Sequence, residues 1–237
     1  MSMDTVISTC SAASADPLAR LRLWQLISPA LPVGAFAWSQ GQEFAVESGW
    51  VRDEAGAAAW IGGLLRHALA QQDVPVLARC HAAWQQGDHA AAEHWSRRLL
   101  AMRESAELRE EDRQLGAALA RLLTDLGVAP AERWTRGEPA SFACLFALAS
   151  VHWHVPLEEA AQGYLWAWCE SQVAAAIKLI PLGQTAGQRL LSTLIEHIPA
   201  AVTRGLAVDD DDIGSSAPGV ALASALHETQ YPRLFRS

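Results

Sequence analysis

The chain has 237 residues, of which 51% are hydrophobic, and carries a formal net charge of -8 at pH 7. This length and hydrophobic content are sufficient for a globular core. The acidic balance and the absence of a basic stripe argue against nucleic-acid binding, because phosphate backbones are bound by clustered Lys and Arg. The cysteines are scattered without CxxC spacing, and three of them lie in apolar helical patterns, which favours a reducing, cytoplasmic location: Cys10, Cys80, Cys144 and Cys169.

The first residues lack both the basic region and the long apolar run of a signal peptide. We therefore expect residues 1–17 to form a disordered N-terminal tail. Beyond them, no part of the chain has a composition of its own, so residues 18–237 are expected to form one domain.

Apolar residues recur at helical intervals along the chain, with glycine, proline or aspartate at the breaks. The first helix is predicted over residues 18–27, before a stiff loop at 28–34, and the second over 35–48, ending near Gly49. Asp53 is the predicted N-cap of a third helix, which runs to about residue 71.

Asp73 is the predicted N-cap of the next helix, which ends at Gly87. The longest helical tract follows over residues 89–126, where no proline interrupts the pattern. Its many charges indicate a solvated face or a partner surface.

Later helices are predicted in the second half of the chain, and an acidic loop and a flexible C-terminal tail complete it. The helices cover residues 141–152, 156–180, 182–197, 199–208 and 218–229, the loop covers 209–218, and the tail covers 230–237. Strand signals are almost absent. The predicted fold is all-α, a bundle of about ten helices around one long apolar helix.

That long helix belongs to the apolar stretch 164–191, which Pro181 divides. Glu170, Gln172 and Lys178 argue against a membrane span, since charged groups at membrane depth are costly. Gln172 projects from the apolar side, and a buried amide needs hydrogen-bond partners, which a loop or a second chain would provide.

Two patterns could hold a metal ion. His152 and His154 would share a face on a strand, but they lie at a helix end, where a capping or core role is favoured over a metal site. The run 209–212 resembles half of a calcium loop but lacks the closing glutamate, so we expect a solvated loop. A nickel-binding metallochaperone using His152 and His154 remains the alternative function.

Signatures of catalysis are missing, so the chain is not expected to be an enzyme or to hold a cofactor. There is no G-x-S-x-G elbow, and the glycines at 183 and 187 are not followed by a Walker lysine. These glycines are expected to allow close helix packing, with Gln184 and Gln188 on one face. A helical hydrolase with an unrecognised site is a further alternative, which only a titratable cluster in a cleft would support.

The C-terminal tail combines aromatic, apolar and arginine side chains, the types enriched at binding hot spots. Both a frayed end and a segment that orders on contact with a partner fit this composition.

Four ordered segments together resemble the UreF family of urease accessory proteins. They are 28–34 with Ser39, Gln40, Gly41 and Glu43; Arg103 and Glu104 with 107–109; 178–184; and 227–231 with 233–237. The departures are Ala35 in place of a common glycine, Gln42 in place of leucine, and Pro232 in place of serine. Only Pro232 bears on function, because it removes an N–H and fixes φ in a tail that would become helical on binding.

The resemblance implies a cytoplasmic, dimeric, non-enzymatic scaffold that joins UreD (also called UreH) to the GTPase UreG and helps to deliver nickel to apo-urease. It also implies two sets of partner-binding residues. The set expected on the UreG side is Glu43, Asp73, Lys178, Gln184 and Gln188, and the set expected to bind UreD is Tyr231, Arg233, Leu234, Phe235 and Arg236.

Overall fold

The computed structural model describes residues 16–135, 139–214 and 217–236. Within these ranges the chain is all-α, with eleven α-helices and no strand, as predicted. The helices are α1 (Pro17–Leu26), α2 (Gln42–Glu47), α3 (Glu54–Leu64), α4 (Asp73–Gln86), α5 (His89–Ala101), α6 (Ala106–Asp125), α7 (Phe142–His152), α8 (Leu157–Leu179), α9 (Gln184–Ile195), α10 (Ile198–Leu206) and α11 (Pro218–His227). Short 3-10 helices are η1 (Ala35–Ala37), η3 (Ala129–Thr135) and η4 (Asp210–Asp212), and η2 (Leu65–Leu69) is a π-helical segment that continues α3.

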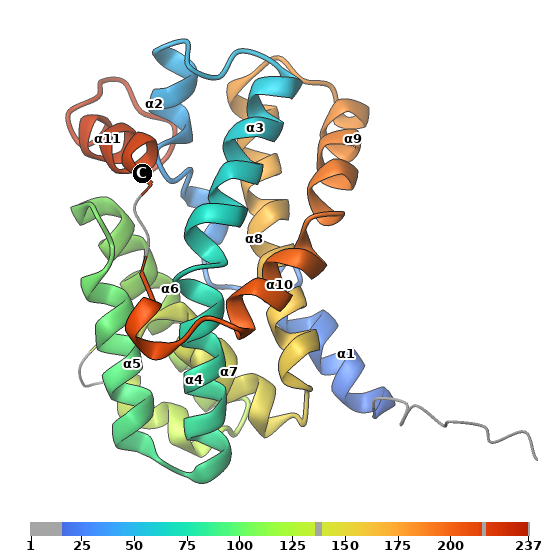
Figure 1. The fold of residues 1–237 in the computed structure, drawn as a ribbon, viewed down its shortest axis with the longest axis vertical. Helices are drawn as coiled ribbons and strands as arrows, with labels where there is room; N and C mark the ends of the chain where they lie inside the picture. The colour runs from blue at the N-terminus through green and yellow to red at the C-terminus, as the bar shows by residue number, and fades with distance from the viewer. Residues whose placement is uncertain (1–15, 136–138, 215–216, 237) are drawn as a thin grey trace, which may run out of the picture.

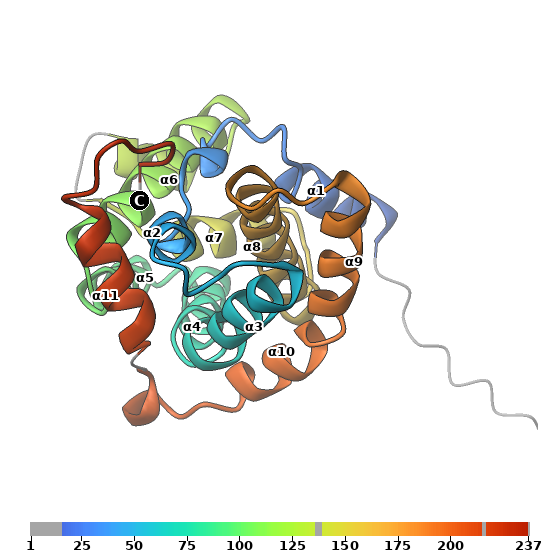
Figure 2. The same cartoon turned by 90° about the horizontal axis from the view of Figure 1, so that it is seen from above.

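The helices form two groups that share one core (Figure 1). Helices α4, α5, α6 and α7 pack on one another, while α2, α3, α9 and α11 surround the opposite end. The long helix α8 contacts α1, α2, α3, α4, α7, α9 and α10, so it links the two groups (Figure 2). No helix in the described ranges has the length and apolarity needed to cross a bilayer.

Polar side chains at the predicted positions begin several helices. Asp53 accepts a hydrogen bond from the Gly56 amide at 2.8 Å, and Asp88 accepts one from the Ala91 amide at 2.9 Å. Each bond satisfies a backbone donor that has no partner inside its helix. These N-caps confirm the predicted starts of α3 and α5.

The predicted helix at 35–48 is wrong in its first half. Residues Ala35–Ala37 form only a short 3-10 turn, and α2 does not begin until Gln42. Gln40 and Gly41 lie between the two with φ of 54° and 76°, in the left-handed region that interrupts a helix. A Cβ at residue 41 would also meet the Ser224 backbone nitrogen at 2.8 Å, so glycine allows α2 and α11 to approach closely.

The tract 89–126 is likewise divided, because α5 ends at Ala101 and α6 begins at Ala106. Ser105 is the N-cap of α6 and accepts from the Leu108 amide at 3.0 Å. The break places Arg103 against side chains from α4 and α6. Tertiary ion pairs thus decide a break that no proline or glycine marks.

The apolar stretch 164–191 divides at its proline, as predicted. Helix α8 ends at Leu179 and α9 begins at Gln184. Gly187 allows α9 to pack on α8, since a Cβ there would come within 2.3 Å of Ile177 Cδ1. Gly183 has open space around it, so the expected packing role applies only to Gly187.

The acidic loop is attached to the bundle as well as solvated. Arg79 of α4 donates to Asp210 Oδ1 at 2.8 Å, and Arg98 of α5 donates to the Asp210 carbonyl at 2.9 Å. These bonds fix η4 against α4 and α5.

Candidate functional site

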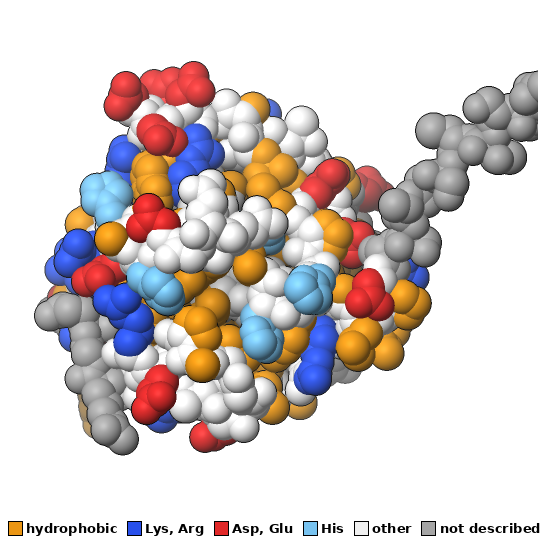
Figure 3. Space-filling view, turned by 90° about the horizontal axis from the view of Figure 1, so that it is seen from below, with side chains coloured by type: hydrophobic (Ala, Val, Ile, Leu, Met, Phe, Trp, Pro, Cys, Tyr) orange, Lys and Arg blue, Asp and Glu red, His pale blue; other side chains and the backbone are white. Residues whose placement is uncertain are grey.

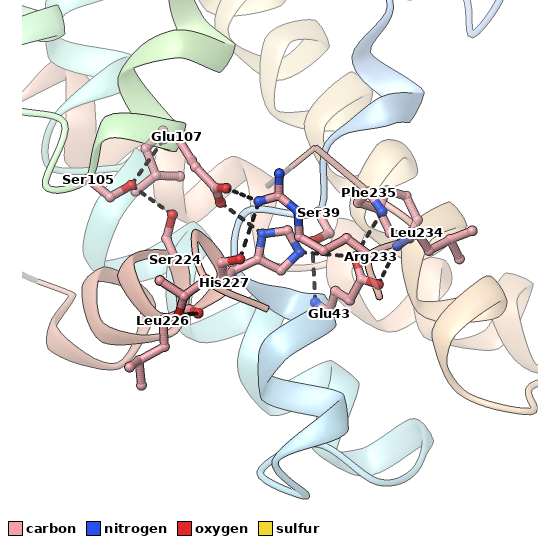
Figure 4. A network of polar contacts seen from close by, with 12 residues as sticks. Ser39, Glu43, Ser105, Glu107, Ser224, Leu226, His227, Arg233, Leu234 and Phe235 are labelled. Carbon is pink, nitrogen blue, oxygen red and sulfur yellow. Dashed lines mark hydrogen bonds and ion pairs between the residues drawn. The ribbon is translucent and has the colours of Figure 1, made fainter. Parts of the chain in front are cut away.

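A buried histidine joins three elements that are far apart in sequence. His227, at the end of α11, is fully buried, with Nδ1 2.8 Å from Glu107 Oε2 of α6 and Nε2 3.0 Å from Glu43 Oε2 of α2 (Figure 4). An imidazolium donates from both nitrogens and satisfies both carboxylates at once. We call Glu43, Glu107, His227 and Arg233 the tail cluster.

The tail cluster binds the C-terminal tail mainly through backbone groups. The amides of Leu234 and Phe235 donate to the two oxygens of Glu43 at 2.6 and 2.8 Å (Figure 4). Arg233 donates to Glu107 Oε1 at 2.5 Å and to the His227 carbonyl at 3.2 Å. Two carboxylates therefore face two basic side chains, and one carboxylate holds two consecutive amides.

Side chains on either side of Phe235 complete the docking of the tail. Phe235 is only 6% exposed, with the Lys178 ammonium 5.4 Å from the centre of its ring. The Arg236 amide donates to the Ala37 carbonyl at 2.9 Å, and the Arg236 guanidinium lies 5.9 Å from the Trp38 ring. The tail, expected to be flexible, thus lies against η1, α2 and α8.

The docked tail leaves other side chains facing outward. Tyr231 is 94% exposed and Leu234 is 65% exposed, whereas Phe235 points inward. Leu222 and Leu226 of the adjoining α11 are also exposed apolar residues. Exposed apolar side chains next to a fixed backbone are suited to contact another protein.

The structure combines parts of the two predicted sets. Glu43 and Lys178 were assigned to one partner and the tail to another, yet both contact the tail. Gln184 and Gln188 are exposed on α9, on the opposite side of the bundle from α11 (Figures 1 and 2).

Asp73 is not the predicted N-cap, because its carboxylate binds partners from elsewhere in the chain. The N-cap position of α4 is Gln72, and no side-chain bond caps the helix. Asp73 is buried and accepts from Arg103 at 2.7 and 3.1 Å and from the Tyr164 hydroxyl at 2.9 Å. Asp73 therefore binds side chains in the interior and does not form part of the exposed surface.

Arg103 lies between two carboxylates of this interior site. Its guanidinium binds Asp73 through two nitrogens, and its Nε donates to Asp112 Oδ2 at 2.9 Å. Asp112 also accepts from the Phe142 amide at 2.6 Å, which connects α6 to the start of α7. We call Asp73, Arg103, Asp112 and Tyr164 the core cluster.

Burial and neighbouring charges shift the pKa values of three groups in the core cluster, Arg103, Asp112 and Tyr164. It opposes the charge of Arg103, but the carboxylates of Asp73 and Asp112 prevail and raise the Arg103 pKa well above its ordinary value. Burial raises the pKa of Asp112 despite the nearby guanidinium. Burial and the Asp73 carboxylate raise the pKa of the Tyr164 hydroxyl well above its ordinary value.

A cavity of about 310 Å³ adjoins the core cluster. Glu111 and Gln172 also line it, and each has one side-chain oxygen without a hydrogen-bond partner among the described residues. Burial raises the pKa of Glu111 to about 8. In the described part of the chain, Gln172 Oε1 therefore lacks the hydrogen-bond partner that a loop was expected to provide.

His152 and His154 are both exposed at the end of α7. Among the described residues, no three His, Cys, Asp or Glu side chains are grouped so as to hold a metal ion. Several histidines are visible on the face seen from below, two of them close together (Figure 3). Within the ranges that the structure describes, the metallochaperone alternative thus has no third protein ligand beside its two histidines.

His227, Glu107, Arg103, Asp112 and Tyr164 were not singled out as site residues from the sequence. One signal could have found His227, which falls on the buried stripe of α11 with Val220, Ala223 and Ser224. A titratable residue on an apolar helix face requires a buried partner. The identity of that partner depends on the tertiary fold.

Comparison with known proteins gives one consistent family. The family model described as UreF matches residues 51–195. A urease accessory protein UreF of Alkalilimnicola ehrlichii is 58% identical over 93% of this chain and 96% of its own length. Proteins of the same name from Chromohalobacter salexigens and Hahella chejuensis are 51% and 48% identical, over 98% and 93% of this chain and 100% and 99% of their own lengths.

Proposed function

The chain belongs to the UreF family of urease accessory proteins, and from this premise we propose that it is a scaffold that bridges UreD (UreH) and the GTPase UreG. In this role residues 18–237 act as one domain, without catalysis of their own, and support GTP-dependent delivery of nickel to apo-urease. The observation that best supports the bridging role is the docked tail, which holds its backbone on Glu43 while Tyr231 and Leu234 face outward.

We assign UreD to the surface formed by α11 and the tail. Tyr231 and Leu234 provide apolar contacts there, and Arg233 and Phe235 hold the tail in position. Because the tail is already docked, a partner would bind it without the full cost of ordering a free segment.

Exposed polar residues at the α8–α9 junction form the proposed UreG surface. Lys178, Gln184 and Gln188 are exposed there, whereas Glu43 and Asp73 are buried. The latter two are positioning residues in this assignment, since they fix the tail and the α4–α6 contact, respectively.

Co-purification from cells that produce all three proteins tests this assignment. The double variant Tyr231→Ala, Leu234→Ala should reduce the UreD captured by about tenfold or more, because it removes two exposed apolar contacts. Leu126→Ala is the matched control, since Leu126 is also exposed but lies at the far end of α6. Equal capture of UreD by the double variant and the control would refute the assignment.

A second pair of variants tests the UreG surface. Gln184→Ala with Gln188→Ala should reduce capture of UreG and leave capture of UreD unchanged, with exposed Gln86→Ala as control; Lys178 is retained because it contacts Phe235 of the tail. Unchanged UreG in the complex would remove these residues from the interface.

We also propose a cytoplasmic homodimer. Free, buried thiols at Cys80, Cys144 and Cys169 suit a reducing compartment. Leu18, Leu21 and Trp24 are exposed along α1 and offer an apolar surface that a second copy would cover. Sedimentation equilibrium of the purified chain tests the dimer, and a mass of one chain at all concentrations would exclude it.

A further inference from the structure

Glu111 is a buried carboxyl group that the proposed scaffold function does not use. It is 6% exposed on α6, and its Oε1 accepts from the Gln40 amide nitrogen at 3.0 Å. Its Oε2 has no hydrogen-bond partner among the described residues. A buried carboxylate with an unpaired oxygen is costly, whereas the neutral acid is much less so.

Within the described ranges, the cation that acts on Glu111 is Arg103, which two other carboxylates share. Arg103, from the α5–α6 loop, is already bound to Asp73 of α4 and Asp112 of α6. These are the charged groups that act on Glu111, and Tyr164 of α8 joins them through Asp73. An ionised Glu111 would thus be a third carboxylate beside a single guanidinium. Glu104 and Glu170, which line the same cavity, are also acidic.

Gln40 connects Glu111 to the segment that carries Glu43, the side chain that binds the tail amides. Its Oε1 accepts from the Trp168 indole of α8 at 2.9 Å, while its nitrogen binds Glu111. Gln40 lies immediately before Gly41 and α2, where Glu43 binds the two tail amides. The position of Gln40 therefore affects the position of Glu43.

A second connection runs along one face of α6. Glu107, Glu111 and Gln114 have the spacing i, i+4, i+7 and share that face. Glu107 binds His227 and Arg233, and Gln114 accepts from Arg236 at 3.0 Å. Glu111 thus lies between two contacts that hold the tail.

We propose that Glu111 is a proton-operated lock: as the neutral acid it stays buried where Gln40 meets α6, and its ionisation, which requires hydration of the carboxylate, opens this segment together with α2 and the C-terminal tail. The proton leaves to solvent, and no other covalent bond is made or broken. The inference concerns the tail itself and does not depend on which partner binds.

The direction of the pH dependence follows from the burial of Glu111, which raises its pKa to about 8 in the closed state. When the segment opens, the group is hydrated and returns to an ordinary pKa of about 4.3. Neutral Glu111 therefore stabilises the closed state fully at a pH below the ordinary pKa, and this stabilisation is lost as the pH rises from there through about 8. Release of the tail should therefore increase with pH over this window.

Hydrogen–deuterium exchange at the amides of Leu234 and Phe235 tests the lock in the full chain. Protection is taken relative to the intrinsic exchange rate at each pH, between about pH 5.5 and 8. As pH rises over this range, the protection of these amides should fall about tenfold or more further in the wild-type chain than in Glu111→Gln. That variant keeps an acceptor for Gln40 but cannot ionise. His227 and the rest of the tail cluster are the same in both proteins, so the comparison isolates the carboxyl group of Glu111.

Two further variants keep the test decisive. Glu158→Gln removes an exposed carboxylate from α8 and should retain the wild-type profile. Gln40→Met is the second choice if Glu111→Gln does not fold, because it removes the hydrogen bond between Gln40 and Glu111. On a logarithmic scale, the change of tail protection with pH should then be less than about half of the wild-type change. Equal pH dependence in the wild-type chain and in whichever of these two variants folds would overturn the proposal.

Discussion

The tail cluster and the core cluster use similar groups for different purposes. Each places two carboxylates around one basic side chain, Arg103 in the core cluster and His227 in the tail cluster, yet the core cluster joins α4, α6 and the α5–α6 loop, whereas the tail cluster holds the C-terminal tail. The carboxylates of the core cluster are bound by side chains and one helix-start amide, and Glu43 binds two amides of the tail. Similar chemistry therefore serves stability in the interior and attachment of a movable segment near the surface.

The largest effect should come from removing the cation of the core cluster. Arg103→Met leaves Asp73 and Asp112 buried without a counter-charge, and should lower the free energy of unfolding by about 3–5 kcal/mol. Urea unfolding at neutral pH measures it. A loss below about 1 kcal/mol would mean that Asp73 and Asp112 become hydrated or protonated at little cost in the variant.

Glu111 should make global stability depend on pH. Its pKa is about 8 when folded and ordinary when unfolded, so its contribution is lost as pH rises to about 8. Between about pH 5 and 8 the wild-type chain should lose about 2–4 kcal/mol more than Glu111→Gln. Parallel stability profiles from urea unfolding would contradict this.

Opening the tail cluster should be milder. Glu43→Ala removes the acceptor of the Leu234 and Phe235 amides and should lower the free energy of unfolding by about 1–3 kcal/mol. Exchange protection at those two amides should be lost while the core helices remain protected. Retained protection of the tail would show that the contacts of Arg233, Phe235 and Arg236 hold it without Glu43.

The smallest effect should come from the hydroxyl of Tyr164. Tyr164→Phe keeps the buried ring and removes one hydrogen bond to Asp73, at a cost of about 1 kcal/mol in unfolding free energy. Thermal unfolding measures it against Tyr231→Phe, whose hydroxyl is on an exposed side chain. Equal melting temperatures would place Tyr164 outside the core cluster energetically.

The sequence predicted what depends on local signals. Asp53 and Asp88 begin their helices because each side chain reaches an amide of its own first turn. Asp73 looked equivalent, but Arg103, thirty residues away, takes its carboxylate. The same ion pair accompanies the break between α5 and α6, which local propensity could not indicate.

The candidate site was predictable in its residues more than in its arrangement. Glu43, Lys178 and the tail were named, but their convergence requires α2, α8 and the chain end to meet. His227 and Glu107 act only as a pair, and 120 residues separate them. Such contacts are set by the packing of helices, which no pattern within a short window of sequence contains.

The most direct test of the scaffold account is co-purification of UreD and UreG with the full chain and with a chain that lacks residues 228–237. The truncated chain keeps the residues of all eleven helices, but loses Arg233 of the tail cluster and the Leu234 and Phe235 amides that Glu43 binds. The account predicts that the full chain captures both partners and that the truncated chain, still folded by circular dichroism, loses UreD. Undiminished capture of UreD by the truncated chain would contradict it.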